Sequence, residues 1–194
     1  GMRFAVRGAF ILTITAEALA PFVWPGAVTD FTWLGLIVTA IFVWAVMELF
    51  KLSTSLLFAT LALTILDAAS ALFELYSRIG PWDIYMHIFG GAIIAAAAMQ
   101  IILRAIKRGG VAVVRRRTAF VIAITYFFTA TVGFLYELLE YVVDKIQYGH
   151  PKSLVSAYDS IEDQVFNVLG TTLVLGAYYL WTDWRTKTKR PESR

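Results

Sequence analysis

Six apolar windows of membrane-spanning length are the feature that most constrains this chain. The hydrocarbon core of a bilayer is about 30 Å thick, so an α-helix needs roughly 20 apolar residues to cross it. Windows of this kind cover approximately residues 4–24, 31–50, 53–76, 83–106, 118–144 and 159–181. The chain is also 59% hydrophobic and only 16% charged, which is outside the usual composition of soluble domains. We therefore expect an all-α, polytopic membrane protein with six transmembrane helices in a compact bundle.

Glycine and proline mark the breaks between these windows, as in Gly80-Pro81 and Gly109-Gly110. We expect residues 1–184 to form a single six-helix transmembrane domain. Residues 185–194, RTKTKRPESR, are expected to form a cytoplasmic polar tail. The absence of cysteine excludes disulfides and thiolate metal sites.

The distribution of Lys and Arg predicts the orientation. Fourteen of the 17 fall at the termini or in the second and fourth loops. By the positive-inside rule, both termini are then cytoplasmic in a multi-pass protein of the plasma (inner) membrane. Topology alone explains the basic loops, so the expected partner is membrane lipid and not nucleic acid. The chain is compatible with a monomer or with a homodimer.

The carboxylates are distributed the opposite way. Eleven of the 14 Asp and Glu residues fall in the outer half of the windows or in the outer loops. The positive-inside rule does not require this, because carboxylates contribute little to it. Ionisable residues at membrane depth usually mark a functional site, so this cluster calls for an explanation of its own.

Helical spacing predicts which of these groups converge. Residues spaced by three, four or seven positions share one face of a helix. Each of the last four windows carries such a polar stripe near its outer end, and small residues such as Gly170 allow helices to approach closely. The candidate residues are Asp67 and Glu74 on the third window, Asp83 and His87 on the fourth, Glu137, Glu140 and Asp144 on the fifth, and Asp159, Asp163 and Asn167 on the sixth.

Three interpretations of this outer-face pocket are open. Carboxylate and amide oxygens with a single imidazole suit Mg²⁺, Ca²⁺ or Mn²⁺ better than zinc, with Glu137, Glu140, Asp163 and Asn167 as ligands. Without a cation, crowded carboxylates would take up protons and act as acid or base, with His87, Asp83 and Glu137 as catalytic candidates. Alternatively, the acids form hydrogen-bonded pairs that only hold the helices together.

Other catalytic motifs are missing from the sequence. A ferritin-like di-iron centre needs two Glu-x-x-His motifs, whereas the two histidines, His87 and His150, lie outside any such motif. The chain contains no Gly-x-Ser-x-Gly elbow, P-loop or dinucleotide fingerprint.

The chain resembles the YjdF-like family of small bacterial and archaeal membrane proteins and, more distantly, the VanZ-like proteins. The resemblance covers roughly residues 65–175. It depends on Asp83-x-x-x-His87 before Gly90-Gly91, on Tyr136-Glu137-x-x-Glu140, and on Asp159-x-x-x-Asp163-x-x-x-Asn167-x-x-Gly170. Ile84 and Glu140 depart from the VanZ-like pattern and favour the YjdF-like branch, which implies a six-helix membrane protein without an agreed activity.

The function that we expect is binding of the polar headgroup of a lipid or lipid-linked envelope precursor, with a divalent cation as a candidate bridge; hydrolysis or transfer of the headgroup is the stronger version of this expectation. Asp67, Glu74, Asp144 and Asp159 are the expected contacts to this substrate. A proton- or cation-coupled transporter is one alternative, although the inner halves of the last three windows offer few polar residues for a relay. A structural or regulatory membrane subunit is another.

Overall fold

The computed structural model describes residues 1–23, 31–108, 115–150 and 157–188, and these ranges are almost entirely helical. No strand occurs among them, which confirms the all-α fold class. The helices are α1 (Met2–Val23), α2 (Phe31–Leu49), α3 (Thr54–Leu72), α4 (Leu75–Arg78), α5 (Trp82–Arg108), α6 (Arg115–Tyr148) and α7 (Ala157–Thr188).

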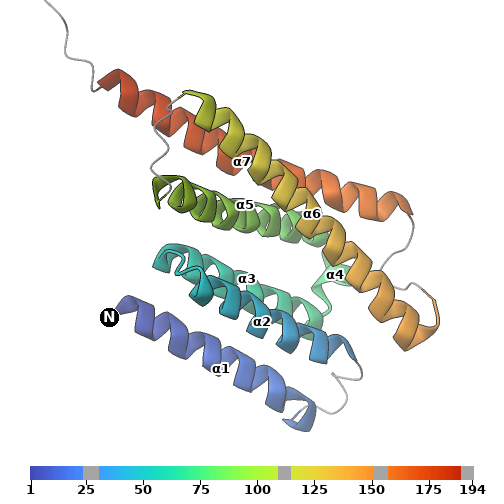
Figure 1. The fold of residues 1–194 in the computed structure, drawn as a ribbon. Coiled ribbons are helices and arrows are strands. Elements are labelled where there is room, and N and C mark those ends of the chain that lie inside the picture. Colours follow the sequence, from blue (N-terminus) through green and yellow to red (C-terminus); the bar gives the residue numbers. More distant parts are fainter. Residues whose placement is uncertain (24–30, 109–114, 151–156, 189–194) are drawn as a thin grey trace, which may run out of the picture.

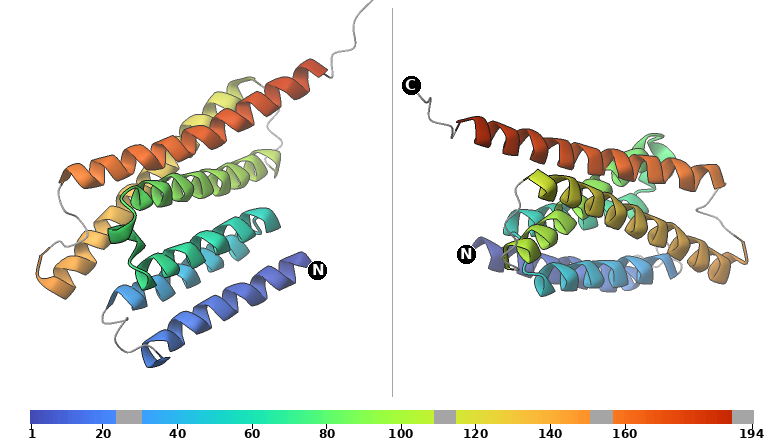
Figure 2. Two further views of the ribbon diagram at one scale, coloured as in Figure 1. Left: turned by 180° about the vertical axis from the view of Figure 1, so that it is seen from behind. Right: turned by 45° about the horizontal axis from the view of Figure 1, so that its top comes forward.

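The long helices alternate in direction along the bundle (Figure 1). The N-terminus, the turn between α2 and α3, and the C-terminal end of α7 lie at one end, and α4 lies toward the other. Helix α5 lies between α3 and α7 in both figures and contacts both of them, while α6 runs obliquely and also contacts α5 and α7 (Figure 2). The helices that carry the predicted polar stripes are therefore neighbours.

In the part of the chain that the structure describes, three helical segments are long and apolar enough to cross a membrane: Trp82–Arg108, Thr118–Val143 and Tyr158–Trp184. Two shorter apolar helices, Ile37–Leu49 and Thr54–Ser70, accompany them within the described residues. Helix α7 continues to Thr188, past the point where we expected the polar tail to begin.

The third window does not form one continuous helix as predicted. Helix α3 ends at Leu72, and Glu74 adopts the left-handed conformation with a φ of 54°. A non-glycine residue in this conformation cannot continue a right-handed helix. The chain therefore turns at Glu74 and forms the separate short helix α4.

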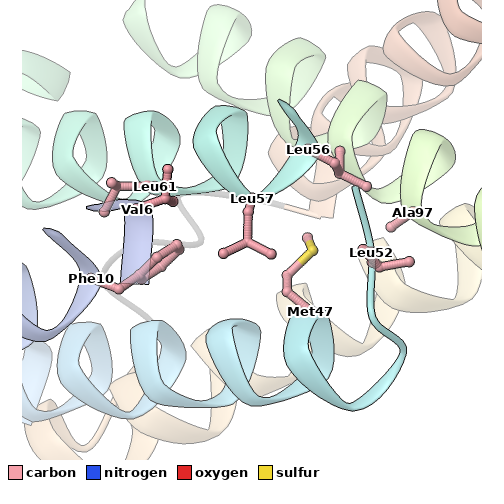
Figure 3. Close-up of a cluster of buried hydrophobic side chains, with 8 residues drawn as sticks. All are labelled: Val6, Phe10, Met47, Leu52, Leu56, Leu57, Leu61 and Ala97. Atoms are coloured by element: carbon pink, nitrogen blue, oxygen red, sulfur yellow. The ribbon is translucent and has the colours of Figure 1, made fainter. Parts of the chain in front are cut away.

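An apolar core lies among α1, α2, α3 and α5 (Figure 3). Phe10, Leu52 and Leu57 are completely buried in it, and Ala97 of α5 closes one side. These side chains belong to the half of the bundle that holds the N-terminus and the α2–α3 turn. The candidate site residues lie toward the other end, near the start of α5 and α7.

Polar contacts fix the α2–α3 turn onto its neighbours. Arg3 and Arg7 of α1 both pair with Glu48 of α2, at 3.1 Å for Arg3 Nη2 and 2.7 Å for Arg7 Nε. Gln100 and Arg104 of α5 reach the same turn, and the Gln100 amide donates to Ser53 Oγ at 2.8 Å while Arg104 donates to the Lys51 carbonyl at 2.7 Å. The first three helices are thus bound to α5 at this end.

Glycine allows α5 and α7 to touch through their backbones. A Cβ atom on Gly91 would collide with the backbone of Asn167, and one on Gly170 would collide with the carbonyl of Ile88. Neither obstacle is a flexible side chain that could move aside. The close approach expected at Gly170 is confirmed, and Gly91 is its counterpart on α5.

We predict that Gly91→Ala separates α5 from α7, whereas Gly90→Ala does not. A Cβ on Gly90 would meet nothing within 4 Å, so this variant is a matched control for helix propensity. Overpacking should lower the free energy of unfolding of Gly91→Ala by about 1–3 kcal/mol, while Gly90→Ala should gain about 0.5–1 kcal/mol. Thermal unfolding in detergent measures both, and equal effects of the two substitutions would contradict the contact.

Candidate functional site

His87 is the centre of the polar cluster at the α5–α7 contact. Its Nε2 atom lies 3.5 Å from Asp83 Oδ1 on its own helix and 3.3 Å from Asp163 Oδ1 on α7. On the other side of the ring, Nδ1 lies 3.3 Å from the side-chain amide of Asn167. The His87 and Asp163 side chains are only 13% and 11% exposed. Both ring nitrogens therefore have neighbours in a largely buried site.

Sequence spacing and the glycine contact together build this arrangement. Asp83 and His87 are four residues apart on α5, and Asp163 and Asn167 are four residues apart on α7, so each pair shares one helix face. The backbone contact at Gly91 sets these two faces against each other.

Two carboxylates converge on one nitrogen of His87. A single N–H bond cannot point well at two acceptors, so a neutral imidazole leaves one carboxylate poorly satisfied. One ligand atom from each of Asp83, His87 and Asp163 lies within 4.8 Å of the others. Ligand atoms that share a metal ion at about 2.0–2.2 Å lie roughly 3–4 Å apart, as His87 Nε2 does from each of the two carboxylates, so these three residues could hold a divalent cation.

The amide of Asn167 can orient the imidazole for metal binding. The oxygen and nitrogen of a side-chain amide exchange places by a simple rotation. With its oxygen toward His87, Asn167 accepts a hydrogen bond from Nδ1–H and leaves the lone pair of Nε2 facing both carboxylates. A partner of this kind on the second ring nitrogen is typical of histidines that bind metals. The sequence predicts Asn167 as a ligand itself; in the structure its amide lies next to Nδ1, away from the nitrogen that faces the two carboxylates, where it could position His87.

A second group of acids surrounds this cluster. Glu137 of α6 is only 5% exposed and Asp67 of α3 is partly buried, and the charges of both act on His87. Asp67 accepts a hydrogen bond of 2.9 Å from the hydroxyl of Tyr76 on α4. Glu140 lies close enough to Glu137 for their charges to interact. Four of the helices thus contribute acids to one region, as the stripes predicted.

Of the predicted substrate contacts other than Asp67, one lies apart from these acids, one lies at their edge, and one has a side chain outside the described part of the structure. Glu74 is exposed and pairs with Arg78 at 3.2 Å, because the turn after α3 carries it off the helical stripe that it was expected to share with Asp67. Asp159 lies in the first turn of α7, one turn before Asp163, and is close enough to Glu137 for its charge to act there. Asp144 belongs to α6, and its side chain lies outside the described part of the structure.

Several polar residues of this region were missed by the sequence analysis. Gln164 follows Asp163 directly, and its side chain lies against Gly133 of α6 beside the Asn167 amide. Tyr76 was hidden in what looked like the end of an apolar window. Glu17 of α1 is buried and its charge acts on Asp67. The burial of Glu17 could have been suspected, because an acid within an apolar window rarely faces lipid.

Comparison with known protein families gives one match. A family model described as "Predicted membrane protein (DUF2238)" matches residues 2–184. The chain belongs to this family. No curated protein and no solved structure matches the chain. Membership in DUF2238 agrees with the membrane location predicted from the apolar windows.

We predict that Asn167→Leu lowers the free energy of unfolding by about 1–3 kcal/mol, because the buried Nδ1 of His87 loses its partner. The imidazole nitrogens of this protein can be observed by ¹⁵N NMR after labelling of its histidines. This chain has only two, so His150 is an internal reference. The ¹⁵N signals of His87 should move in Asn167→Leu and those of His150 should not. Unchanged His87 signals would show that Asn167 does not control the imidazole.

Proposed function

We propose that this DUF2238 protein binds a divalent cation, Mn²⁺ in particular, between Asp83, His87 and Asp163, and uses it to hold the polar headgroup of a membrane amphiphile. The observation that carries the proposal is the convergence of one imidazole nitrogen and two carboxylates from α5 and α7 within 4.8 Å. Carboxylates suit Mg²⁺, Ca²⁺ and Mn²⁺, and imidazole suits the transition metals. Of the three cations predicted from the sequence, Mn²⁺ accepts both kinds of ligand most readily.

The position of the cluster supports a lipid headgroup as the substrate. Asp83 lies in the first turn of α5, and Asp163 lies in the second turn of α7, so the cluster is near the ends of two spans and not at their middle. A cation held there can contact the phosphate of a headgroup while the lipid chains stay in the bilayer. Hydrolysis or transfer of the headgroup is an extension of this proposal, in which the metal activates a bound water.

We extend the proposal to the family branch and the membrane orientation of the chain. A YjdF-like affiliation within DUF2238 is supported by the Asp83, Glu137, Asp163 and Asn167 motifs. The excess of Lys and Arg on one side supports cytoplasmic termini in a plasma membrane. The cluster of Asp83, His87 and Asp163 then faces the outer leaflet, where lipid-linked envelope precursors are used.

A proton relay through the bundle is less well supported. Buried threonines do continue from the cluster along α6 and α7, including Thr129 and Thr171. However, Thr129 donates to the carbonyl of Thr125 and Thr171 donates to that of Asn167, each four residues earlier on the same helix. These hydroxyls are satisfied within their own helices and do not form a chain between the two ends.

Titration with Mn²⁺ tests the metal site directly. We expect Mn²⁺ to raise the melting temperature in a saturable way and to broaden the ¹⁵N signals of His87 while leaving those of His150 sharp, because a paramagnetic ion broadens only nearby nuclei. Asp83→Asn and Asp163→Asn should each weaken binding by about tenfold or more, since each removes a charged ligand. Glu162→Gln, an exposed acid of the same helix, is the matched control and should bind like the native chain.

Two results would overturn this proposal. One is equal broadening of His87 and His150, which would indicate surface binding only. The other is the absence of any response to Mn²⁺, Mg²⁺ or Ca²⁺ in a chain whose Asp163→Asn variant is as stable as the native protein or more so. That outcome would favour protonated carboxyl groups that serve structure alone.

A further inference from the structure

A groove between α6 and α7 opens on the lipid-facing side of the bundle. Its volume is about 550 Å³, which is within the range of roughly 300–1,000 Å³ for small-molecule sites. Six apolar or aromatic side chains form its walls and are 39–62% exposed. They are Phe134, Leu138 and Tyr141 on α6, and Ile161, Val165 and Val168 on α7. All six lie within the two membrane-spanning segments, so acyl chains are the natural occupants of these walls.

The floor of the groove is polar, and several of its side-chain atoms lack hydrogen-bond partners in the described part of the chain. Glu137 is 5% exposed, and neither of its carboxylate oxygens has a hydrogen-bond partner among the described residues. The amide nitrogen of Gln164 is also buried without a partner there. Ser160 completes the polar lining. An acceptor with a negative charge and an unused donor therefore lie together beneath an apolar wall.

This floor specifies the chemistry of a headgroup. Apart from the neighbouring Ser160 hydroxyl, Glu137 has no donor close by, and no ion pair among the described residues gives its carboxylate a positive partner. The charges of Asp83 and Glu140 also act in this region, so a purely anionic headgroup would be repelled. Gln164 in turn needs an acceptor. A headgroup with a primary ammonium close to a phosphate supplies both, since the ammonium donates to Glu137 and the phosphate accepts from Gln164.

The groove also adjoins the metal cluster. A Cβ atom on Gly133 would lie 2.7 Å from the Gln164 Oε1 atom and 3.1 Å from the Asn167 Nδ2 atom, so both amides meet at this glycine. Gly133 is one helical turn before Glu137. A phosphate bound at Gln164 would thus lie on the side of the groove that faces the His87 cluster.

We propose that the α6–α7 groove binds an amine-headed phospholipid of the phosphatidylethanolamine class, with its ammonium on Glu137 and an acyl chain along the apolar walls. This inference depends on the proposed function only in placing the phosphate beside the metal cluster. Binding of the ammonium and the chain requires no metal, so the two proposals can fail separately.

Native mass spectrometry of the detergent-solubilised full chain tests the groove. Phosphatidylethanolamine, phosphatidylcholine and phosphatidylglycerol with identical acyl chains are compared in the presence of EDTA. We expect phosphatidylethanolamine to bind about tenfold more tightly than either of the others, because a quaternary ammonium cannot donate hydrogen bonds and glycerol carries no cation. Glu137→Gln should abolish this preference, and Glu162→Gln should keep it.

A second variant tests the walls. Val165→Trp fills the groove at a position that is 58% exposed, where a larger side chain is tolerated, and should weaken binding of all three lipids alike. The comparison of headgroups on the native chain needs no variant, so the proposal can be tested even if Glu137→Gln fails to fold.

Equal binding of the three lipids by the native chain, or a preference that persists in Glu137→Gln, would overturn the inference. A dimer that Val165→Trp dissociates, without any headgroup preference, would overturn it in favour of self-association through this face. If the native chain prefers phosphatidylethanolamine in EDTA but does not respond to Mn²⁺, the groove proposal stands and the metal proposal is wrong. If the chain responds to Mn²⁺ but binds the three lipids equally, only the groove proposal is wrong.

Discussion

The backbone contact between α5 and α7 is the interaction on which the polar end of this bundle depends. Gly91 and Gly170 let the two helices touch without intervening side chains. This contact fixes both the distance and the rotation of the helices, and it places His87 opposite Asp163 and Asn167. In a membrane the contact cannot be replaced by a hydrophobic effect between helices, because lipid is as apolar as the side chains. Close packing and polar contacts must hold the site together instead.

The rest of the chain forms a scaffold that leaves this end free for polar chemistry. The apolar core of α1, α2, α3 and α5 lies toward the opposite end, where Gln100 and Arg104 bind the α2–α3 turn onto α5. Helix α5 therefore belongs to both halves. Its later residues pack in the core, and its first turns carry Asp83 and His87. The acids can then be grouped without disrupting the packing that holds the helices.

The sequence predicts helices better than it predicts contacts between them. Apolar windows located every long helix, because length and hydropathy are local properties. The stripes at Asp83 and His87, and at Asp163 and Asn167, were predicted from spacing alone. The break at Glu74 was not, because a left-handed residue without glycine leaves no signal in composition. Gln164 was missed for another reason, since its role depends on Gly133 of a different helix.

Glu137 is the residue that a purely structural account explains least well. Gly133 of α6 lies against Gln164 and Asn167 of α7, and a contact of this kind needs no carboxylate beside it. A buried polar group without a partner costs about 1–3 kcal/mol, and a charged one costs more. A leucine at this position would remove that cost, and a glutamine would remove the part that is due to the charge. A chain that keeps the acid at the floor of a lipid-facing groove is therefore better explained by a ligand that supplies the missing donor than by the stability of the fold.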